Sequence, residues 1–374
     1  MAAPLILVSV SPGEQRTALL AGDLIDGDRL EAAFIERPAR PEGVGDLHIA
    51  RLSARAPAMG GAFLAMAGGE TGFLPDSEGA KGRTEGEWLR VAVTRAAQGG
   101  KGPRLAARPG PEAPQGPPRL LARGPDAPLR LAAQHPEATL RTDHPATAAR
   151  LRAALGAARV SLSTAPAFDE AVEEAFETLS GMAVPLPGGG RLTLHPTPAL
   201  LAIDIDAGAA AGGRDAAAHR TLNAAALAEA LRQIRLRHLA GAILIDMAGM
   251  PIARRRDLLP GLQPHLAADP HLRLVGMTGL GLIELQRRRV HTPLHEVLGD
   301  PPSPLTRGLL ALRRGVREAA ARPGARLALT AHPAVLAALR DWPGALEEFT
   351  RAAGPLSLRA DPLCPPGQEH VHAE

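Results

Sequence analysis

Short apolar runs separated by turn residues dominate the first part of the chain and predict strands. Between residues 4 and 36 these runs alternate with Ser11-Pro12-Gly13 and Gly22-Asp23, which are typical of tight turns, so we expect a β-meander. From residue 43 to 106 the runs are short and separated by glycine-containing turns, which predicts a small closed barrel of the OB type. The expected barrel strands are 46–53, 61–66, 71–74, 88–94 and 103–105.

The pattern changes after residues 107–118, which are rich in proline and glycine. We interpret this segment as a linker, because its composition supports neither a helix nor a central strand. Apolar residues then recur at helical spacing, most clearly in 146–155 and 168–179. The glycine-rich run from Pro187 to Gly190 predicts a hairpin turn, with strands at 182–186 and 191–195.

From residue 199 onward strands alternate with helices, which is typical of an α/β layer with parallel strands. The fold class that this pattern predicts is α/β, in the form of an α+β multidomain chain that also contains the barrel. Strands are expected at 199–204, 242–246 and 272–277, and helices at 221–238, 252–266 and 281–289. After the prolines of 301–304 a smaller α/β piece is expected, with helices 305–320 and 333–340, strands 326–330 and 355–359, and a polar tail.

Two of the predicted strands end in an aspartate, Asp204 and Asp246. If the strands are neighbours, both carboxylates can reach one Mg²⁺ ion, which prefers oxygen ligands and substrate phosphates. The alternative is that the acids cap helices or are solvated at strand ends. The sequence alone leaves both interpretations open.

Charge adds basic clusters to this picture. The formal net charge is +3 and nearly all cations are arginines, since Lys81 and Lys101 are the only lysines. Arginine suits phosphate recognition because its planar fork binds oxyanions bidentately. We expect the clusters to converge near the two aspartates and regard Arg254 and Arg287 as RNA-binding candidates, although each cluster alone is typical of a solvated face. The clusters are Arg232 with Arg235, Arg237 and His238, then 254–256, then 287–289.

The single cysteine, Cys364, excludes an intramolecular disulfide and a cysteine-rich zinc site, which fits a cytoplasmic protein. No apolar run approaches the length of a membrane span. We therefore expect no membrane partner.

Several spaced motifs, in the right order, resemble the ribonuclease E/G family. In the N-terminal part the chain has Gly61-Ala-Phe63, Thr71-Gly72-Phe73-Leu74-Pro75 and Gly100-Lys101-Gly102. The more distinctive motifs are Asp204-Ile-Asp206-Ala-Gly, Leu222-Asn223-Ala-Ala, Arg232-Gln-Ile-Arg-Leu-Arg237-His-Leu-Ala-Gly241, Ile-Leu-Ile-Asp246-Met and Met277-Thr-Gly-Leu-Gly281-Leu-Ile-Glu284-Leu.

The resemblance implies an OB-type barrel inserted in an RNase H-like subdomain, followed by a DNase I-like catalytic subdomain and a small C-terminal domain. The corresponding ranges are 1–36 with 119–195, 37–106, 196–300 and 305–374, with the linker at 107–118. Carried over by motif position, Asp204 and Asp246 are implied to bind Mg²⁺. Phe63, Phe73 and Lys101 are implied to hold single-stranded RNA, and Arg273 corresponds loosely to a phosphate-contacting arginine. The two phenylalanines suit base stacking, but filling the barrel interior is an equal alternative.

The chain also departs from the family pattern. The linker leaves no room for the family's sensor of the RNA 5′-monophosphate, and the zinc-binding cysteines that pair protomers are absent, so a homo-oligomer stays open but a zinc-linked dimer is not expected. Asp206 replaces an asparagine and is a candidate third metal ligand. Gly249 stands where a further acid is often found.

The leading hypothesis is a Mg²⁺-dependent endoribonuclease that cleaves single-stranded RNA to 5′-phosphate and 3′-hydroxyl ends, in RNA processing or decay. The main alternative is a catalytically weak or inactive RNA-binding relative of the same family. A nucleotide-using enzyme would rest on Gly276-x-x-Gly279-x-Gly281 alone, which is a weak pattern because no phosphate-loop lysine accompanies it.

Overall fold

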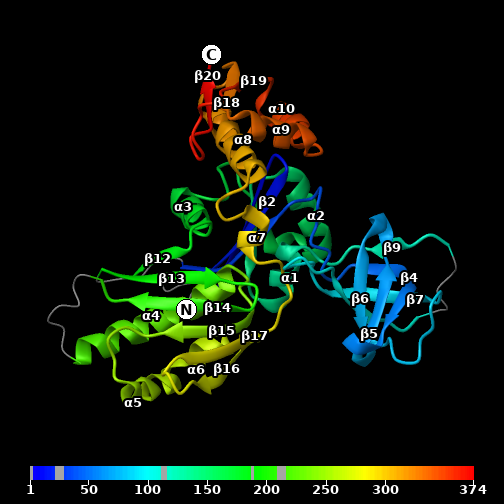
Figure 1. Cartoon of the computed structure of the whole chain (residues 1–374). Coiled ribbons are helices and arrows are strands. Elements are labelled where there is room, and N and C mark those ends of the chain that lie inside the picture. The colour runs from blue at the N-terminus through cyan, green and yellow to red at the C-terminus, as the bar shows by residue number, and fades with distance from the viewer. Residues whose placement is uncertain (1–2, 22–28, 111–115, 187–188, 209–215) are drawn as a thin grey trace. The chain divides into compact units, whose positions relative to one another are not determined.

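The computed structural model describes residues 3–21, 29–110, 116–186, 189–208 and 216–374. The chain divides into two compact units, and both are discontinuous in sequence, as the colours of Figure 1 show. The first unit comprises residues 1–41, 127–181 and 297–374, and the second comprises 42–126 and 182–296.

The first unit contains a five-stranded sheet in the order β11-β10-β1-β2-β3. The expected meander is confirmed by antiparallel pairing of β1 (Leu5–Ser11), β2 (Glu14–Ala21) and β3 (Arg29–Glu36). The expected turn at Gly22-Asp23 lies outside the described residues. Parallel strands β10 (Thr139–Thr142) and β11 (Val160–Leu162) extend the sheet. Helices α1 (Ala127–Gln134) and α2 (Pro145–Leu155) pack against it through Leu131 and Leu151, and α3 (Glu170–Thr178) follows.

The C-terminal part of the first unit is a three-stranded sheet with β18 (Leu327–Ala331) in the centre. Its edges are β19 (Leu356–Ala360), parallel to β18, and β20 (His370–Ala373), antiparallel to it. The polar tail expected here is therefore wrong, because these residues pair with β18. Helices α8 (Pro304–Ala321), α9 (Pro333–Asp341) and α10 (Ala345–Ala353) share its apolar core, and α10 was not expected.

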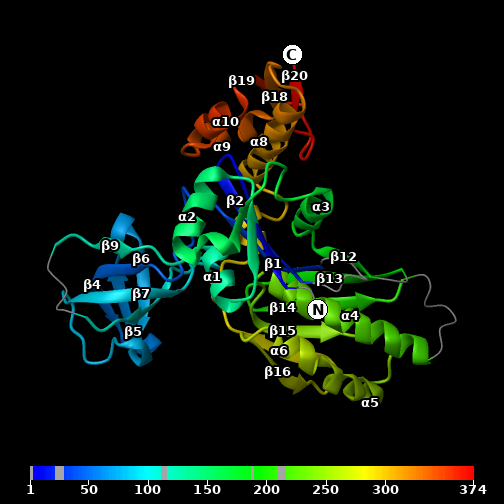
Figure 2. The ribbon, with the colours of Figure 1, turned by 180° about the vertical axis from the view of Figure 1, so that it is seen from behind.

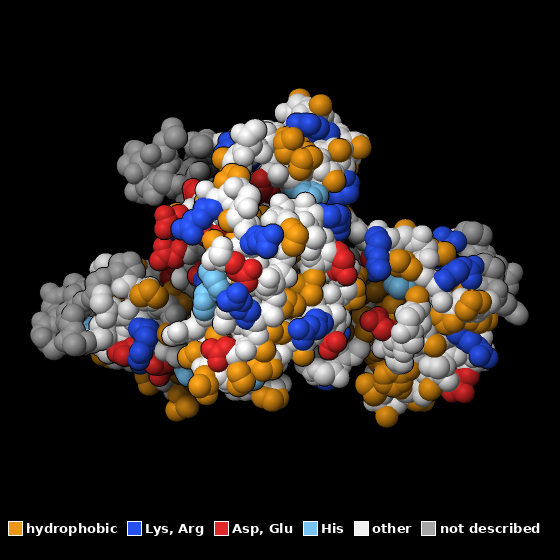
Figure 3. Space-filling model, turned by 90° about the horizontal axis from the view of Figure 1, so that it is seen from above, with side chains coloured by type: hydrophobic (Ala, Val, Ile, Leu, Met, Phe, Trp, Pro, Cys, Tyr) orange, Lys and Arg blue, Asp and Glu red, His pale blue; other side chains and the backbone are white. Residues whose placement is uncertain are grey.

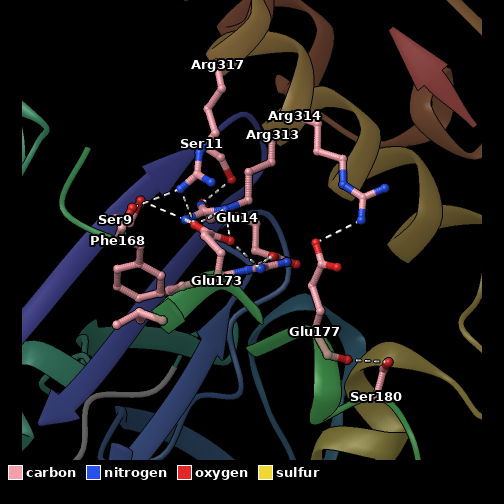
Figure 4. Close-up of polar contacts among 12 residues, drawn as sticks. Ser9, Ser11, Glu14, Phe168, Glu173, Glu177, Ser180, Arg313, Arg314 and Arg317 are labelled. Atoms are coloured by element: carbon pink, nitrogen blue, oxygen red, sulfur yellow. Dashed lines mark hydrogen bonds and ion pairs between the residues drawn. The ribbon is translucent and has the colours of Figure 1, made fainter. Parts of the chain in front are cut away.

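A buried cluster of charges links the elements of the first unit (Figure 4). The carboxylate of Glu173, on α3, pairs with Arg16 of β2 at 3.3 Å and with Arg313 and Arg317 of α8. Arg16 also donates to Glu14 at 2.9 Å. Because buried charges are stable only when they are paired, this cluster holds the sheet, α3 and α8 together.

The second unit contains a closed barrel of five strands, consistent with the OB-type barrel expected from the sequence. Its neighbours run β5-β6-β8-β7-β4, and β4 pairs with β5 to close it. Alternate residues such as Leu52, Leu64 and Leu105 fill the interior. The strands are β4 (Leu47–Ala56), β5 (Gly61–Ala65), β6 (Thr71–Pro75), β7 (Trp88–Arg95) and β8 (Arg104–Ala107), and β9 (Arg119–Ala122) pairs with the outer edge of β4.

The remainder of the second unit is a six-stranded sheet in the order β12-β13-β14-β15-β17-β16. Helix α4 (Ala216–Leu236) and the broken helix α5 (Ile252–Arg255), η6 (Arg256–Leu262) and α6 (Gln263–Ala267) follow β14 and β15 along the chain. Figures 1 and 2 show α4 and α6 on one face of the sheet, where Leu227, Leu231 and Ile234 join its buried core. The strands are β12 (Ala183–Leu186), β13 (Gly190–Pro196), β14 (Leu200–Asp206), β15 (Gly241–Asp246), β16 (Leu272–Met277) and β17 (Ile283–Arg287). Helix α7 (Leu294–Leu298) spans the boundary of the units along the sequence.

This sheet corrects two expectations. Only β14 and β15 are parallel, whereas the other neighbours are antiparallel. The helix expected at 281–289 is wrong, because Ile283, Leu285 and Arg287 are buried alternately with Glu284 and Gln286, which is the period of a strand. A short turn joins β16 to β17, and a connection of this length requires antiparallel pairing.

The same turn removes the nucleotide-using alternative. Gly279 and Gly281 lie in the hairpin turn, where Thr278 N donates to Leu282 O at 2.9 Å, and a strand follows it. A phosphate-binding glycine loop would instead lead into a helix. The boundary expected at residue 196 also shifts, because β12 and β13 belong to this sheet. None of the helices among the described residues is long and apolar enough to cross a membrane.

Candidate functional site

Asp204 and Asp246 lie side by side in the second unit. They are register partners in the parallel pair β14–β15, and neighbouring strands lie about 4.8 Å apart. Both side chains are exposed, while Ile203, Ile205 and Ile245 point into the core on the opposite face. Neither acid caps a helix, so that part of the alternative is wrong, whereas both acids are exposed to solvent at or near strand ends, as its other part states. Among the described residues, the carboxylate of Asp204 has no hydrogen bond or ion pair.

Asp246 has a cationic partner that the sequence interpretation did not single out. The guanidinium of Arg255 donates to its Oδ1 at 2.8 Å and also donates to the backbone carbonyls of Met247 and Met250, each at 2.9 Å. A further bond reaches Gly281 O at 3.1 Å. Arg255 therefore fixes the loop after β15 beside the acids. In the sequence, the one indication of this role was that Arg255 lies in the arginine run 254–256 soon after Asp246.

Asp206 is not gathered with the other two acids. Its side chain accepts a hydrogen bond from Gly208 N at 2.9 Å and lies 3.7 Å from Arg191 on β13. Within the described part of the chain, no group of three His, Cys, Asp or Glu side chains is arranged to hold a metal. The structure thus gives no support to Asp206 as a third ligand, whereas the two paired aspartates match the one or two carboxylates that Mg²⁺ uses in phosphate sites.

The loop after Asp246 is shaped by Asn223 and His219 of α4. Asn223 is fully buried and binds both backbone groups of Ala248, donating to its oxygen at 2.8 Å and accepting from its nitrogen at 3.1 Å. Gly249 has φ +57°, and a Cβ there would lie 2.7 Å from the imidazole of His219. A side chain at position 249 would therefore collide with His219. The imidazole of His219 occupies the space that an acidic side chain at this position would need.

Phe63 and Phe73 form a cross-strand pair on the outside of the barrel. They are register partners on β5 and β6, and their rings are 5.4 Å apart in an edge-to-face arrangement. Both are partly exposed, whereas the intervening Ala62, Leu64 and Leu74 fill the interior. The alternative that the phenylalanines fill the barrel is therefore wrong, and their faces are accessible for stacking.

Lys101 is exposed at the end of a tight turn. Gln98 and Lys101 exchange backbone hydrogen bonds of 3.0 and 3.1 Å around Gly99 and Gly100, whose φ values of 59° and 70° suit a type I′ turn. Lys101 shares a cavity with residues at the beginnings of β14 and β15, whereas Asp204 and Asp246 lie at or near the other ends of these strands. The structure therefore separates Lys101 from the acids.

The three basic clusters do not converge. Arg254 is exposed, 3.8 Å from Asp257, in the cluster nearest the acids. Arg273 is exposed on β16 and donates to Gln286 at 2.8 Å. Arg287 is buried and paired with Asp269 at 2.7 Å, opposite the start of β15, so its expected RNA contact is corrected to a structural role. On the face that Figure 3 shows, basic side chains are scattered among acidic and hydrophobic ones.

The cluster at the end of α4 is also structural in part. Arg237 is buried, and burial together with the neighbouring Arg232 lowers its pKa to about 10. Its Nε donates to Gln233 at 2.7 Å, and its backbone oxygen accepts from Leu294 N at 3.0 Å. Because α4 ends where β15 begins, this cluster too lies at the far end from Asp246.

Comparison with known proteins now supplies the decisive observation. The sequence model of the Ribonuclease E/G family matches residues 141–290, which include β14, β15 and both aspartates. Over residues 141–290 the chain is thus similar to the ribonuclease E/G family. The resemblance recognised from the motifs is thereby confirmed.

Individual relatives agree with the family match. Ribonuclease E of Nostoc sp. is 39% identical over 124 residues, covering 31% of this chain and 18% of the relative. Ribonuclease G of Haemophilus influenzae is 36% identical over 141 residues, covering 36% of this chain and 28% of that relative. Ribonuclease G of Escherichia coli is 33% identical over 183 residues, covering 45% of this chain and 37% of that relative. The matched part of the chain thus spans between about a fifth and two fifths of these ribonucleases.

Proposed function

We propose that this chain is a Mg²⁺-dependent endoribonuclease that cleaves single-stranded RNA and leaves 5′-phosphate and 3′-hydroxyl ends. The observation that carries the proposal is the register pairing of Asp204 and Asp246, with both side chains exposed on one face of the sheet. The names of the relatives, ribonuclease E and ribonuclease G, support the reaction class.

Asp204 and Asp246 would hold Mg²⁺, which at such a site generates a nucleophilic water and stabilises charge on a phosphoryl oxygen. Arg255 orients Asp246 and neutralises part of its charge through the 2.8 Å ion pair. Asn223 fixes the backbone of the following loop. Arg255 and Asn223 thus hold Asp246 and the loop after it in place, and such preorganisation favours electrostatic stabilisation of a transition state.

RNA binding would use the exposed aromatic pair and exposed cations. Phe63 and Phe73 offer stacking faces, and each stacked base contributes about 1–3 kcal/mol. Lys101, Arg254 and Arg273 are exposed and available to phosphates. We further assign the barrel to the family's OB-type domain, the sheet β12–β17 to its DNase I-like subdomain and the meander sheet to its RNase H-like subdomain. The single buried cysteine, Cys364, favours a cytoplasmic location.

The test is a cleavage assay with a fluorescent single-stranded RNA. We expect cleavage with Mg²⁺, none with EDTA, and none in Asp204→Asn or Asp246→Asn at equal protein concentration. Arg191→Gln, which removes a charge on the same sheet outside this group of residues, is the matched control and should cleave normally. An intact substrate with wild-type protein, or equal cleavage by Asp246→Asn, would refute the proposal.

The phosphorylation state of the RNA tests the missing 5′ sensor. Since the described residues of the segment joining the barrel to α1 form no element except the short β9, we expect similar cleavage rates for 5′-monophosphorylated and 5′-triphosphorylated RNA. Rates measured on the same sequence with the two ends decide this. A strong preference for the monophosphate would mean that another part of the chain reads the 5′ end.

A second candidate, a non-catalytic RNA-binding protein, is favoured by one feature. His219 fills the space beside Gly249, where the family resemblance implies a further acid, and the site has two well-placed carboxylates among the described residues. Salt-dependent RNA binding without Mg²⁺-dependent cleavage would support this candidate. Phe63→Leu should weaken RNA binding whichever function is correct. Asp204→Asn distinguishes the two functions, because it should abolish cleavage only if the chain is an endoribonuclease.

A further inference from the structure

A cavity of about 390 Å³ lies within the second unit, between the barrel and the sheet. One side is formed by the barrel turn Gln98–Lys101 and by Arg95. The other side is formed by the beginning of β14, by Leu239 and Ala240 just before β15, and by the chain that follows β17, which includes Arg289. It lies at the opposite end of β14 and β15 from Asp204 and Asp246. A volume of this size is typical of a site for a small organic ligand rather than for a single ion.

The cavity has fixed walls because one segment, residues 290–296, ties the barrel to the sheet. Ala96 N donates to Val290 O at 2.8 Å, and Gln98 Nε2 donates to His291 O at 3.1 Å. Gly99 N donates to Glu296 Oε2 at 2.8 Å. On the sheet side, Leu294 N donates to Arg237 O at 3.0 Å. The cationic turn is thus held against the sheet by hydrogen bonds at several points.

Three cations, Arg95, Lys101 and Arg289, face a single carboxylate in this cavity. That carboxylate, on Glu296, is already bonded to the turn. Among the described residues, Arg289 makes no hydrogen bond or ion pair, and its guanidinium lies over Gly241, where a Cβ would be 2.6 Å from it. Burial, together with Arg104 and Arg289, lowers the pKa of Arg95. Nε of Arg95 is buried and has no partner within the described chain. The three positive charges repel one another, and a bound anion would relieve that repulsion.

The remaining wall is apolar and is formed by Pro196, Pro198, Leu200, Leu239 and Pro293. We propose that this cavity binds one nucleotide of the RNA strand, with its phosphate on Arg95, Lys101 and Arg289 and its sugar or base against the apolar wall. Arg289 offers its whole fork to the oxygens of a phosphate, whereas Arg95 offers its remaining donors, since one amino group already donates to Gly102 O at 2.7 Å. Prolines and leucines suit a ring or a sugar. A free inorganic anion would leave the apolar wall unused.

The cavity is a second nucleotide contact, separate from the reacting phosphate. Leu200 and Asp204 are four residues apart along β14, which at about 3.3 Å per residue is about 13 Å. That the bound nucleotide belongs to an RNA strand rests on the proposed function. That the cavity binds a nucleotide does not rest on it, and this binding can be measured without cleavage.

Calorimetric titration of the full chain in EDTA tests the cavity without any metal at the acids. The probes are adenosine monophosphate, inorganic phosphate, adenosine and a short single-stranded oligoribonucleotide. We expect the monophosphate to bind more tightly than inorganic phosphate and adenosine, and the oligonucleotide to compete with it. Arg289→Gln should weaken monophosphate binding at least tenfold and flatten its salt dependence. Arg288→Gln removes the same charge from the neighbouring residue, which contacts His271 outside the cavity, and should leave binding unchanged.

The outcomes separate the two proposals. If adenosine monophosphate does not bind, or if Arg288→Gln and Arg289→Gln weaken it equally, the cavity is not a nucleotide site. If the mononucleotide binds but the oligonucleotide does not compete, assignment to the RNA strand is wrong. If both bind as expected while no RNA is cleaved with Mg²⁺, the proposed endoribonuclease activity fails and the nucleotide site stands.

Discussion

The two units each contain a pair of acids, and the pairs are built in opposite ways. In the first unit, Glu14 and Glu173 are buried, and Arg16 links them in a cluster with further arginines (Figure 4). In the second unit, Asp204 and Asp246 are exposed, and Arg255 is the one cation paired with them among the described residues. A buried carboxylate must be neutralised within the fold, whereas an exposed carboxylate with spare oxygen lone pairs can bind something from solution.

The largest difference should appear when one acid of the exposed pair is removed. Asp204→Ala should lower cleavage about a thousandfold or more, because metal-assisted catalysis supplies several kcal/mol and each 1.36 kcal/mol is a factor of ten. Its free energy of unfolding should change by no more than about 0.5 kcal/mol, as for other surface substitutions. Single-turnover cleavage and urea unfolding measure the two effects. A large loss of stability would show that Asp204 is a structural residue.

The opposite result is expected for Glu173. Glu173→Gln leaves Arg313 buried without its carboxylate and removes one of the two carboxylates that pair with Arg16, and it should destabilise the first unit by about 3–5 kcal/mol. Glu177→Gln is the matched control on the same helix, because its pair with Arg314 is exposed and worth only about 0–1 kcal/mol.

Tryptophan fluorescence can report on the first unit alone. Trp342 is buried there, and a Trp88→Phe background removes the other tryptophan of the chain. Urea unfolding in this background should show a lower midpoint for Glu173→Gln and an unchanged one for Glu177→Gln. Equal midpoints would mean that the buried cluster contributes no more than a surface ion pair.

These contrasts show what the sequence could and could not predict. The barrel strands, the strands that end in acids and the small C-terminal domain follow from local periodicity and glycine turns, and they were largely predicted. The segment 283–287 was not, because Ile-Glu-Leu-Gln-Arg fits a helical and a strand period equally until its partner strand is known. That error also misplaced Arg287, since an antiparallel β17 carries it away from the acids.

Roles that depend on contacts between distant segments were also beyond the sequence. Arg255 stands among three consecutive arginines, and only the fold shows that this one reaches Asp246. Likewise, Gly249 looked like a lost acid, whereas the structure shows that His219 occupies the space.

A substitution at position 249 tests whether His219 excludes a side chain there. Gly249→Asp introduces a side chain at φ +57°, a conformation that costs about 1–2 kcal/mol, and pushes it against His219. Gly249→Asp should therefore destabilise the second unit, and adding His219→Ala should recover the part due to the collision. A double-mutant cycle on the free energies of unfolding measures the coupling. Additive effects would show that the ring and position 249 are independent.

The exposed aromatic pair should give a smaller effect, on binding alone. Phe63→Leu should weaken single-stranded RNA binding by about 1–3 kcal/mol, because one stacking face is lost. Phe63→Tyr keeps the face and should restore the affinity, and Phe34→Leu, in the first unit, controls for loss of a phenylalanine elsewhere. Fluorescence anisotropy with a labelled oligoribonucleotide gives the three affinities. Equal binding by Phe63→Leu and wild type would exclude stacking on this ring.

The smallest effect concerns pH and the buried acid Glu14. Burial alone would raise its pKa, but Arg16 and Arg37 outweigh burial and hold the pKa below its ordinary value of 4.5. Since the folded pKa is the lower one, ionised Glu14 stabilises the first unit above about pH 4.5, and this contribution is lost as the pH falls through the folded pKa. The stability difference between wild type and Glu14→Gln, followed through Trp342, should therefore shrink as the pH is lowered from 6 to 3. A difference that stays constant would show that Glu14 does not titrate differently in the folded and unfolded chain, and that its arginines act by packing alone.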